Sequence, residues 1–140
     1  MDEPLTEELL NELLDAPSPQ LFLSKHPSKP RKLSNYLQEL LSQRGLQRKD
    51  VVRAAHLNDT YGYQIFTGER AHPGRDKVLQ VAIAMQLSLL ETDRALQAAG
   101  ASRLYCKDRR DAIIIFCLDH HMSLDSTNDT LYSFGETTLG

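Results

Sequence analysis

Apolar residues recur every three or four positions along most of this chain, which is the period of an amphipathic helix. The first such segment, residues 6–16, places leucines on one face and glutamates on the other. The same period predicts further helices at residues 32–44, 48–55, 59–67, 75–85, 89–99, 109–120 and 124–134. The isoleucine-rich run at 113–116 has β-propensity, but it is short and its flanks are helical. The pattern therefore predicts an all-α fold.

Polar residues and glycines mark the ends of these segments. Side chains that can accept a hydrogen bond from the first helical turn are expected at Thr6, Ser34, Asn58, Ser88, Asp108 and Ser123. Ser88 and Glu91 have the spacing of a capping box. Glycines, which tolerate the left-handed conformation that ends many helices, close the segments at Gly45, Gly68, Gly100 and Gly135.

Prolines separate the first helix from the rest of the chain. Four of the six prolines lie between residues 17 and 30, which predicts a linker or an irregular wrap. We expect an N-terminal helix and Pro-rich linker at 1–30, a core at 31–100 and a C-terminal helical extension at 101–140. The leucine face of the first helix either folds back on the core or crosses to another subunit. The last two helices either extend the core or form a dimer.

The net charge of −3 over 140 residues hides an uneven distribution. Residues 1–30 carry −4, residues 31–94 carry +3 and residues 95–140 carry −2. A basic middle segment between acidic ends is typical of a small nucleic-acid-binding core with appended segments. The acidic total indicates that non-specific affinity for DNA is modest.

Several classes of protein do not fit this composition. Two cysteines cannot build a disulfide scaffold, and we expect Cys106 and Cys117 to be packed, reduced thiols. No run of about 18 apolar residues could span a membrane, and the first 20 residues lack the basic region of a signal peptide, so we expect a cytoplasmic protein without a membrane partner.

The residues do not suggest catalysis, a cofactor or a metal site. Adjacent His120 and His121 point in different directions on a helix and have no third ligand at a useful spacing. No nucleophile set and no Gly-rich phosphate loop is apparent, so the sequence predicts that this protein is not an enzyme. Arg109 and Arg110 are interpreted as a solvated helix start in preference to a phosphate clamp.

The informative stretch is residues 45–75. Two short helices are joined there by a turn of three or four residues, which is the spacing of a helix-turn-helix. Its apolar positions are Leu46, Val51, Val52, Ala55, Leu57 and Ile65. In this arrangement the first helix braces the second, so that the second can enter the major groove of DNA.

Residues 33–100 resemble the Cro/phage-repressor type of helix-turn-helix, the XRE-like family, without insertion or gap. The matching features are Gly45-Leu46, Val51, Ala55, Leu57, Asn58, Ile65, Gly68-Glu69-Arg70 and Pro73. The resemblance implies a lambda-repressor-like five-helix core and a sequence-specific transcriptional regulator. It also implies a double-stranded DNA partner, a helix at about 59–67 in the major groove, and association as a symmetric dimer.

The resemblance assigns roles residue by residue. The positions that would read base edges are Asp59, Thr60, Tyr61 and Gln64, and Gln64 has the geometry to pair with adenine. The positions that would contact the DNA backbone are Arg48, Tyr63, Thr67, Arg70 and Arg75. Among the aromatic residues we expect Phe66 and Tyr63 to belong partly to the core and Tyr61 to be the most exposed.

Five positions depart from the family's pattern, and one of them is Phe66, which replaces an acid. Val52 stands where a small residue is usual, His56 where the turn usually has glycine, and Gly62 where a β-branched residue is common. His56 must then adopt a left-handed conformation or reshape the turn. Asp59 is an acid near the expected phosphates. These departures allow an alternative, in which the helix-turn-helix fold is kept and its surface docks a regulatory protein partner.

Overall fold

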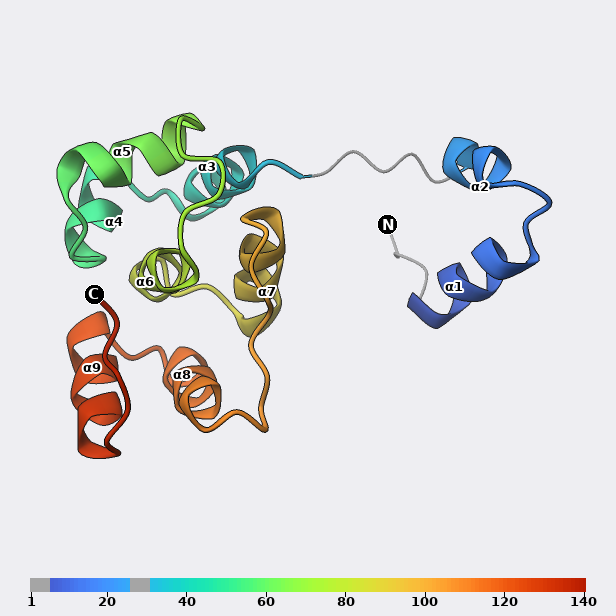
Figure 1. Cartoon of the computed structure of the whole chain (residues 1–140). Coiled ribbons are helices and arrows are strands. Elements are labelled where there is room, and N and C mark those ends of the chain that lie inside the picture. The colour runs from blue at the N-terminus through green and yellow to red at the C-terminus, as the bar shows by residue number, and fades with distance from the viewer. Residues whose placement is uncertain (1–5, 26–30) are drawn as a thin grey trace. The chain divides into compact units, whose positions relative to one another are not determined.

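The computed structural model describes residues 6–25 and 31–140, and within them it contains helices and no strand. The helices are α1 (Thr6–Asp15), α2 (Pro19–Lys25), α3 (Leu33–Arg44), α4 (Arg48–Ala54), α5 (Asp59–Thr67), α6 (Arg75–Ala84), α7 (Leu89–Ala98), α8 (Arg109–Asp119) and α9 (Leu124–Ser133). The all-α prediction is confirmed, including the isoleucine-rich run, which lies in α8 (Figure 1).

The chain forms two compact units, residues 1–30 and residues 31–140. In the first unit α1 packs against α2. The expected linker was wrong at 19–25, because Ser18 Oγ accepts from the Leu21 N–H (3.3 Å) and Pro19 occupies the first helical position, where its missing N–H costs nothing. Leu10, Leu13 and Leu14 remain exposed in this unit. The expected cap at Thr6 lies outside the described side chains.

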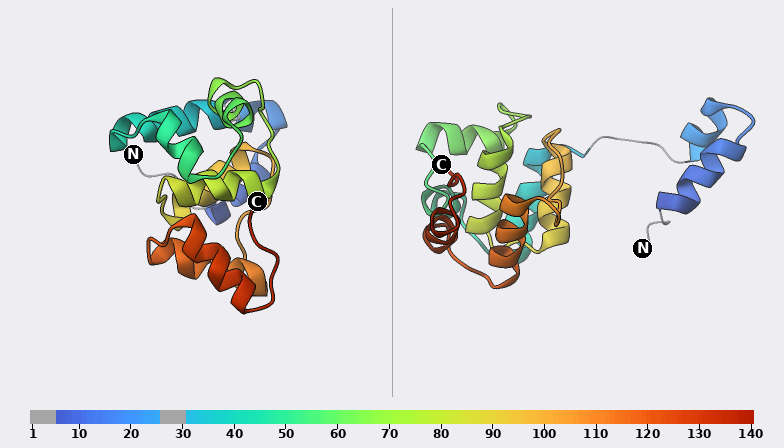
Figure 2. Two further views of the ribbon diagram at one scale, coloured as in Figure 1. Left: turned by 90° about the vertical axis from the view of Figure 1, so that its left-hand side faces the viewer. Right: turned by 60° about the horizontal axis from the view of Figure 1, so that its bottom comes forward.

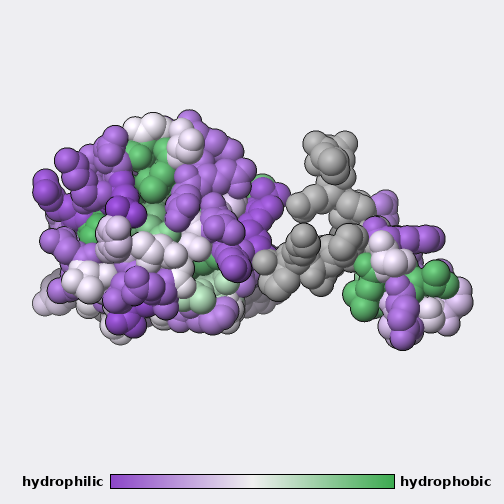
Figure 3. Space-filling view, turned by 90° about the horizontal axis from the view of Figure 1, so that it is seen from above, coloured by the Kyte–Doolittle hydropathy of each residue, from purple (hydrophilic) through white to green (hydrophobic). Residues whose placement is uncertain are grey.

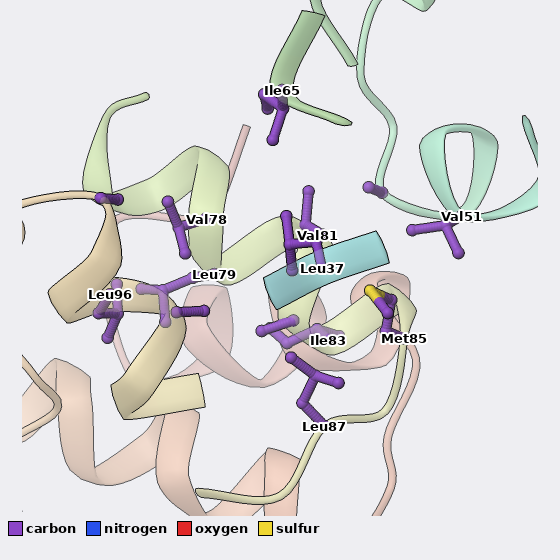
Figure 4. Packing of buried hydrophobic residues seen from close by; sticks show 14 of the residues in the cluster. Leu37, Val51, Ile65, Val78, Leu79, Val81, Ile83, Met85, Leu87 and Leu96 are labelled. Carbon is purple, nitrogen blue, oxygen red and sulfur yellow. The ribbon is translucent and has the colours of Figure 1, made fainter. Parts of the chain in front are cut away.

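The core of the second unit is built around α6. Seven apolar residues of that helix and its turn are at most 2% exposed: Val78, Leu79, Val81, Ala82, Ile83, Met85 and Leu87. In Figure 4 they meet side chains from several other elements, among them Leu37, Val51 and Leu96. Helices α4, α7 and α9 all pack on α6, so this one helix joins the residues expected to bind DNA to the C-terminal extension.

Three helical hairpins, α4–α5, α6–α7 and α8–α9, share one kind of turn. In each, one non-glycine residue is left-handed: His56 (φ 55°), Gln86 (φ 55°) and His121 (φ 52°). The N–H of the next residue donates to a carbonyl five positions earlier, Leu57 to Val52 (3.2 Å), Leu87 to Ala82 (3.0 Å) and Met122 to Cys117 (3.0 Å). Of the two outcomes expected at His56, a left-handed conformation or a reshaped turn, the structure has the first.

The predicted caps at Asn58, Ser88, Asp108 and Ser123 are confirmed, as is the capping box of Ser88 and Glu91. The cap expected at Ser34 was wrong, because α3 begins at Leu33 and Ser34 is buried in the first turn of the helix. Its hydroxyl lies close to Gly68, where an added Cβ would stand 3.1 Å from Ser34 Oγ.

Residues 75–104 recur as a structural repeat at residues 110–139, 35 positions later, and the two copies exchange contacts. Arg75 donates to both carboxylate oxygens of Asp111 (2.9 and 2.7 Å), and Arg110 donates to both of Asp76 (2.9 and 3.0 Å). Corresponding hydrogen bonds from a backbone N–H to a side chain lie at the end of each copy. Leu104 N–H donates to Asp93 Oδ1 (2.9 Å), and Leu139 N–H donates to Asn128 Oδ1 (2.7 Å).

The exchange relates the two repeats as a pseudo-two-fold axis would. Helix α6 of the first repeat packs on α9 of the second, and α7 packs on α8 (Figure 2). The C-terminal hairpin therefore extends the core. Arg109 is solvated at the start of α8 as expected, with 67% of its side chain exposed, although it also donates to the Phe134 carbonyl (2.7 Å). The expectation was wrong for Arg110, whose side chain is 19% exposed and donates to Asp76 and to the Thr137 carbonyl (2.9 Å).

The cysteines differ from each other. Cys117 is buried, as predicted, and burial raises the pKa of its thiol. Cys106 was expected to be packed but is exposed, since it lies in the segment between the two repeats.

Asp111 carries the most constrained charge of the repeat. Burial by itself would raise the pKa of this carboxyl, since only 8% of the side chain is exposed. Hydrogen bonds from Arg75 and from the Tyr105 N–H (3.0 Å), with the charges of Arg75 and Arg110, act in the opposite direction and prevail. The pKa of Asp111 therefore lies below its ordinary value, and its ionised form stabilises the fold.

Replacing Asp111 by asparagine is expected to lower the free energy of unfolding by about 2 kcal/mol near pH 7, because the Arg75 guanidinium loses its ionic partner. The folded pKa is depressed, so this contribution is present above the unfolded carboxyl pKa of about 3.9 and is lost as the pH falls further. Urea unfolding of wild type and Asp111→Asn between neutral and acidic pH measures the difference. Asp129→Asn, at an exposed acid of α9, is the matched control. A difference that did not change with pH would contradict the role of the charge.

Candidate nucleic-acid interface

Helix α5 begins and ends where local sequence signals place it. The Asn58 side chain accepts hydrogen bonds from the N–H groups of Thr60 (3.0 Å) and Tyr61 (3.2 Å), which would otherwise lack partners in the first turn. Gly68 ends the helix with a φ of 91°. The helix lies at one end of the second unit, packed on α3 and α4 (Figure 1).

One face of α5 is buried and the opposite face is open. Gly62, Ile65 and Phe66 point inward. Thr60 and Thr67 are exposed and Gln64 is partly so, which is a stripe at helical spacing. Four of the predicted residues, Asp59, Thr60, Tyr63 and Gln64, line one shallow hollow together with Glu69. The structure therefore brings three of the four expected base-reading residues together.

The tyrosines lie on the two edges of this face, in the reverse of the expected order of exposure. Tyr63 is 49% exposed, whereas Tyr61 is partly buried and packs against the core. Phe66 is fully buried, as predicted. The order could not be read from the helical period, because both tyrosines flank the buried stripe and the neighbouring elements decide which one is covered.

Each tyrosine carries an arginine on its ring. The Arg48 guanidinium carbon lies 3.9 Å from the ring centre of Tyr63, and that of Arg70 lies 4.3 Å from the ring centre of Tyr61. Arg70 Nε also donates to Gln64 Oε1 (2.8 Å). Stacking of this kind holds a guanidinium in place without neutralising its charge. Two fixed positive charges therefore flank the open stripe of α5.

Sequence reasoning missed two further cations beside this stripe. Lys49 and Arg53 line a hollow with Arg48, Asp59 and Tyr63. The signal was present in the sequence, since Lys49 and Arg53 are four positions apart and so share one face of α4. Figure 3 shows the second unit from above the view of Figure 1, and most of the surface on that side is hydrophilic.

Two of the predicted backbone-contacting residues are engaged within the fold. Thr67 Oγ1 donates to the Gln64 carbonyl (3.2 Å). Arg75 donates to Asp111 and to the carbonyls of Ser102 (3.0 Å) and Arg103 (3.2 Å). The Arg75 guanidinium is thus committed to joining the two repeats, and we do not include it in the interface.

The seat of α5 on α4 explains two of the departures from the family's pattern. A Cβ at Gly62 would stand 2.5 Å from Val52 Cγ1 and 2.8 Å from Val52 Cγ2, distances that real Cβ atoms do not show. The larger residue stands on α4 and the smaller one on α5, so the two positions complement each other in volume. Gly62 is therefore required by Val52, and its helix-propensity cost of about 1 kcal/mol is the consequence.

A double-mutant cycle measures this exchange. Gly62→Ala alone is expected to destabilise the protein by about 1–3 kcal/mol through overpacking, and Val52→Ala alone by about 2 kcal/mol through a cavity. The free energy of unfolding of Val52→Ala/Gly62→Ala should be at least about 1 kcal/mol higher than the value obtained by adding the two single effects. The reason is that Val52→Ala leaves space for the new methyl group at position 62, and that methyl group fills part of the cavity. Guanidinium unfolding gives the three values. Additive effects would show that the two positions do not share one space.

In the described part of the chain, no three His, Cys, Asp or Glu side chains are grouped so that they could hold a metal ion. Over the same residues no helix has the length and apolar composition needed to cross a membrane. No family model, no curated protein and no solved structure matches this chain.

Proposed function

We propose that residues 31–140 form a sequence-specific DNA-binding transcriptional regulator that places α5 in the major groove of double-stranded DNA. In this proposal α3 to α7 correspond to the five-helix core of the Cro/phage-repressor type. The protein acts by binding, with no catalytic step and no cofactor. The second repeat supports this core and leaves α5 free.

A single observation carries the proposal: the open stripe of α5 lies between two arginines that are held by tyrosine rings. A major groove accepts one helix, and phosphates border it on both sides. Arg48 and Arg70 sit on opposite edges of α5 through Tyr63 and Tyr61. This spacing suits one guanidinium for each bordering phosphate strand, with Lys49 and Arg53 adding charge on the side of α4.

The hydrogen bond from Arg70 fixes the orientation of the Gln64 side-chain amide. Its side-chain oxygen accepts from Arg70 Nε, so the amide NH2 is the end left to donate. A purine offers N7 as an acceptor in the major groove, and guanine also offers O6. Thymine offers O4 as an acceptor as well, whereas cytosine offers only a donor, so the fixed amide disfavours a cytosine at the position that Gln64 meets.

A protein partner is the second candidate, and the acids of the same surface favour it. Asp59 and Glu69 line one hollow with Tyr63, which is 49% exposed. Carboxylates repel phosphate, whereas an exposed ring between carboxylates can receive a lysine or arginine of another protein. In this case the partner's contact surface is basic.

Selection of bound duplexes from a random pool, followed by fluorescence anisotropy, tests the proposal. Arg48→Gln is expected to weaken binding to all duplexes alike and to reduce the salt slope by about one, because one phosphate contact is lost. Arg103→Gln, at an exposed arginine outside α4 and α5, is the matched control. No duplex binding even at low salt would overturn the proposal.

Gln64→Ala is expected to act differently from the loss of a phosphate contact. It should relax the preference at one base pair by about 1–3 kcal/mol and leave binding to other positions unchanged. Gln97→Ala, at an exposed glutamine of α7, is the control. Stoichiometric capture of a basic protein that Tyr63→Ala abolishes, without any duplex binding, would select the second candidate.

A further inference from the structure

Asp59 is a charged residue of the α5 surface that the fold itself does not use. It occupies the first position of α5, where an acid suits the helix dipole, but Asn58 makes the capping bonds of that turn. The Asp59 side chain is exposed, and within residues 6–25 and 31–140 its carboxylate accepts no hydrogen bond and forms no ion pair. Both carboxylate oxygens are therefore available to a ligand.

Three cations line a hollow together with this carboxylate. Arg48, Lys49 and Arg53 lie there, and Asp59 also lines the second hollow of the surface, beside Thr60 and Gln64. An acid among cations that attract phosphate lowers the affinity for any duplex, because it repels the phosphates. This loss is offset where the carboxylate meets a hydrogen-bond donor, so Asp59 contributes selectivity in place of affinity.

Two of the four bases present a donor to a carboxylate in the major groove. Guanine and thymine offer acceptors there, whereas cytosine offers its N4 amine and adenine its N6 amine. Adenine also places the N7 acceptor beside its amine, and the N7 lone pair repels a carboxylate. Cytosine has a C–H group, at C5, in the corresponding place. The Asp59 carboxylate therefore matches cytosine.

Gln64, which lines a hollow with Asp59, has the opposite polarity. Its side-chain oxygen accepts from Arg70 Nε (2.8 Å), so its amide NH2 is left to donate and meets no acceptor on cytosine. The cytosine amine is thus accepted at Asp59 and refused at Gln64. A chemical change to that amine therefore acts through Asp59.

We infer that Asp59 makes the α5 surface sensitive to a chemical mark on DNA, the methylation of a cytosine N4 amine. One hydrogen of this amine pairs with guanine, and the other points into the major groove. A methyl group on N4 replaces the second hydrogen, because the first is needed for the base pair. The Asp59 carboxylate then faces an apolar group without a donor, which costs binding free energy. This inference rests on the proposed function and adds the mark that the surface distinguishes.

Fluorescence anisotropy of the full chain with duplexes selected from a random pool tests the inference. Each cytosine of a selected duplex is replaced in turn by N4-methylcytosine or by 5-methylcytosine. We expect N4-methylation of one cytosine to weaken binding at least about tenfold, which is the size of a lost hydrogen bond to a charged group. Methylation of the same cytosine at C5 adds a methyl group to the neighbouring atom and keeps the donor, so its effect should stay below about threefold.

Asp59→Ala assigns the effect to the carboxylate. This variant should bind the unmodified and the N4-methylated duplex within about twofold of each other, and unrelated duplexes more tightly than wild type, since a repelling charge is gone. Asp50→Ala is the matched control, because it removes an equal charge at an exposed acid of α4 and should keep the discrimination of wild type. Circular dichroism checks that both variants are folded, which the cap at Asn58 favours for α5.

Three results would overturn the inference. The first is an equal loss of binding from N4-methylation and from C5-methylation, and the second is discrimination that survives in Asp59→Ala. The third is a set of selected duplexes in which N4-methylation of no cytosine weakens binding. Duplexes are still bound in all three cases, so the proposed function stands. Failure of every duplex to bind at low salt is a different outcome, which overturns the proposed function and the inference with it.

Discussion

The left-handed residue in the turn of each hairpin is the constraint on which the rest of the structure depends. At His56, Gln86 and His121 the chain accepts a conformation that costs a side-chain-bearing residue roughly 1–2 kcal/mol. The turn repays this cost by aiming the next residue inward, so that Leu57 and Leu87 become buried. It also places Asn58, Ser88 and Ser123 where each can cap the following helix. The crossing of every hairpin follows from these local bonds.

One hairpin geometry then serves two purposes. In the α6–α7 and α8–α9 hairpins the same dipeptide lies in the first turn of the first helix, Arg75-Asp76 in α6 and Arg110-Asp111 in α8, and the two pairs bind crosswise. Each guanidinium also binds the carbonyls that follow the other end of its own hairpin. In α4–α5 no such dipeptide occurs, and the exchange of volume between Val52 and Gly62 sets the seat of the second helix. The α4–α5 hairpin, whose second helix has an open outer face, is therefore the one that lacks these crosswise Arg–Asp ion pairs.

The limits of the sequence-based prediction follow from the range of the interactions. Caps and helix ends could be predicted because Asn58, Ser88 and Gly68 act on residues within one turn of themselves. The start of α2 also depends on neighbouring residues, Ser18 and Pro19. The density of prolines nevertheless favoured a linker or an irregular wrap there, so the helix was not predicted. The carboxylate partners of Arg75 and Arg110 lie 36 and 34 positions away along the chain, so helical periodicity could not reveal them.

The candidate site shows the same division. The outward stripe of Thr60, Gln64 and Thr67 follows from the helical period alone. The order of Tyr61 and Tyr63 and the stacking of Arg48 and Arg70 depend on how α4 and the loop after α5 pack, which no spacing within α5 encodes. The DNA-binding role and the family resemblance stay proposals that the geometry of this surface supports.

The pair Gln80 and Ile115 shows how two copies of one repeat can take different neighbours. Gln80 is fully buried, and its amide NH2 donates to the Ala55 carbonyl in the turn before α5, while its Oε1 has no hydrogen-bond partner in the structure. Such a half-satisfied amide costs about 1–3 kcal/mol, and it is retained where a backbone carbonyl must be met. Ile115 meets no such carbonyl, so an apolar side chain suits its position. The polar copy thus holds the α4–α5 hairpin to the core, and the apolar copy has no such hairpin to hold.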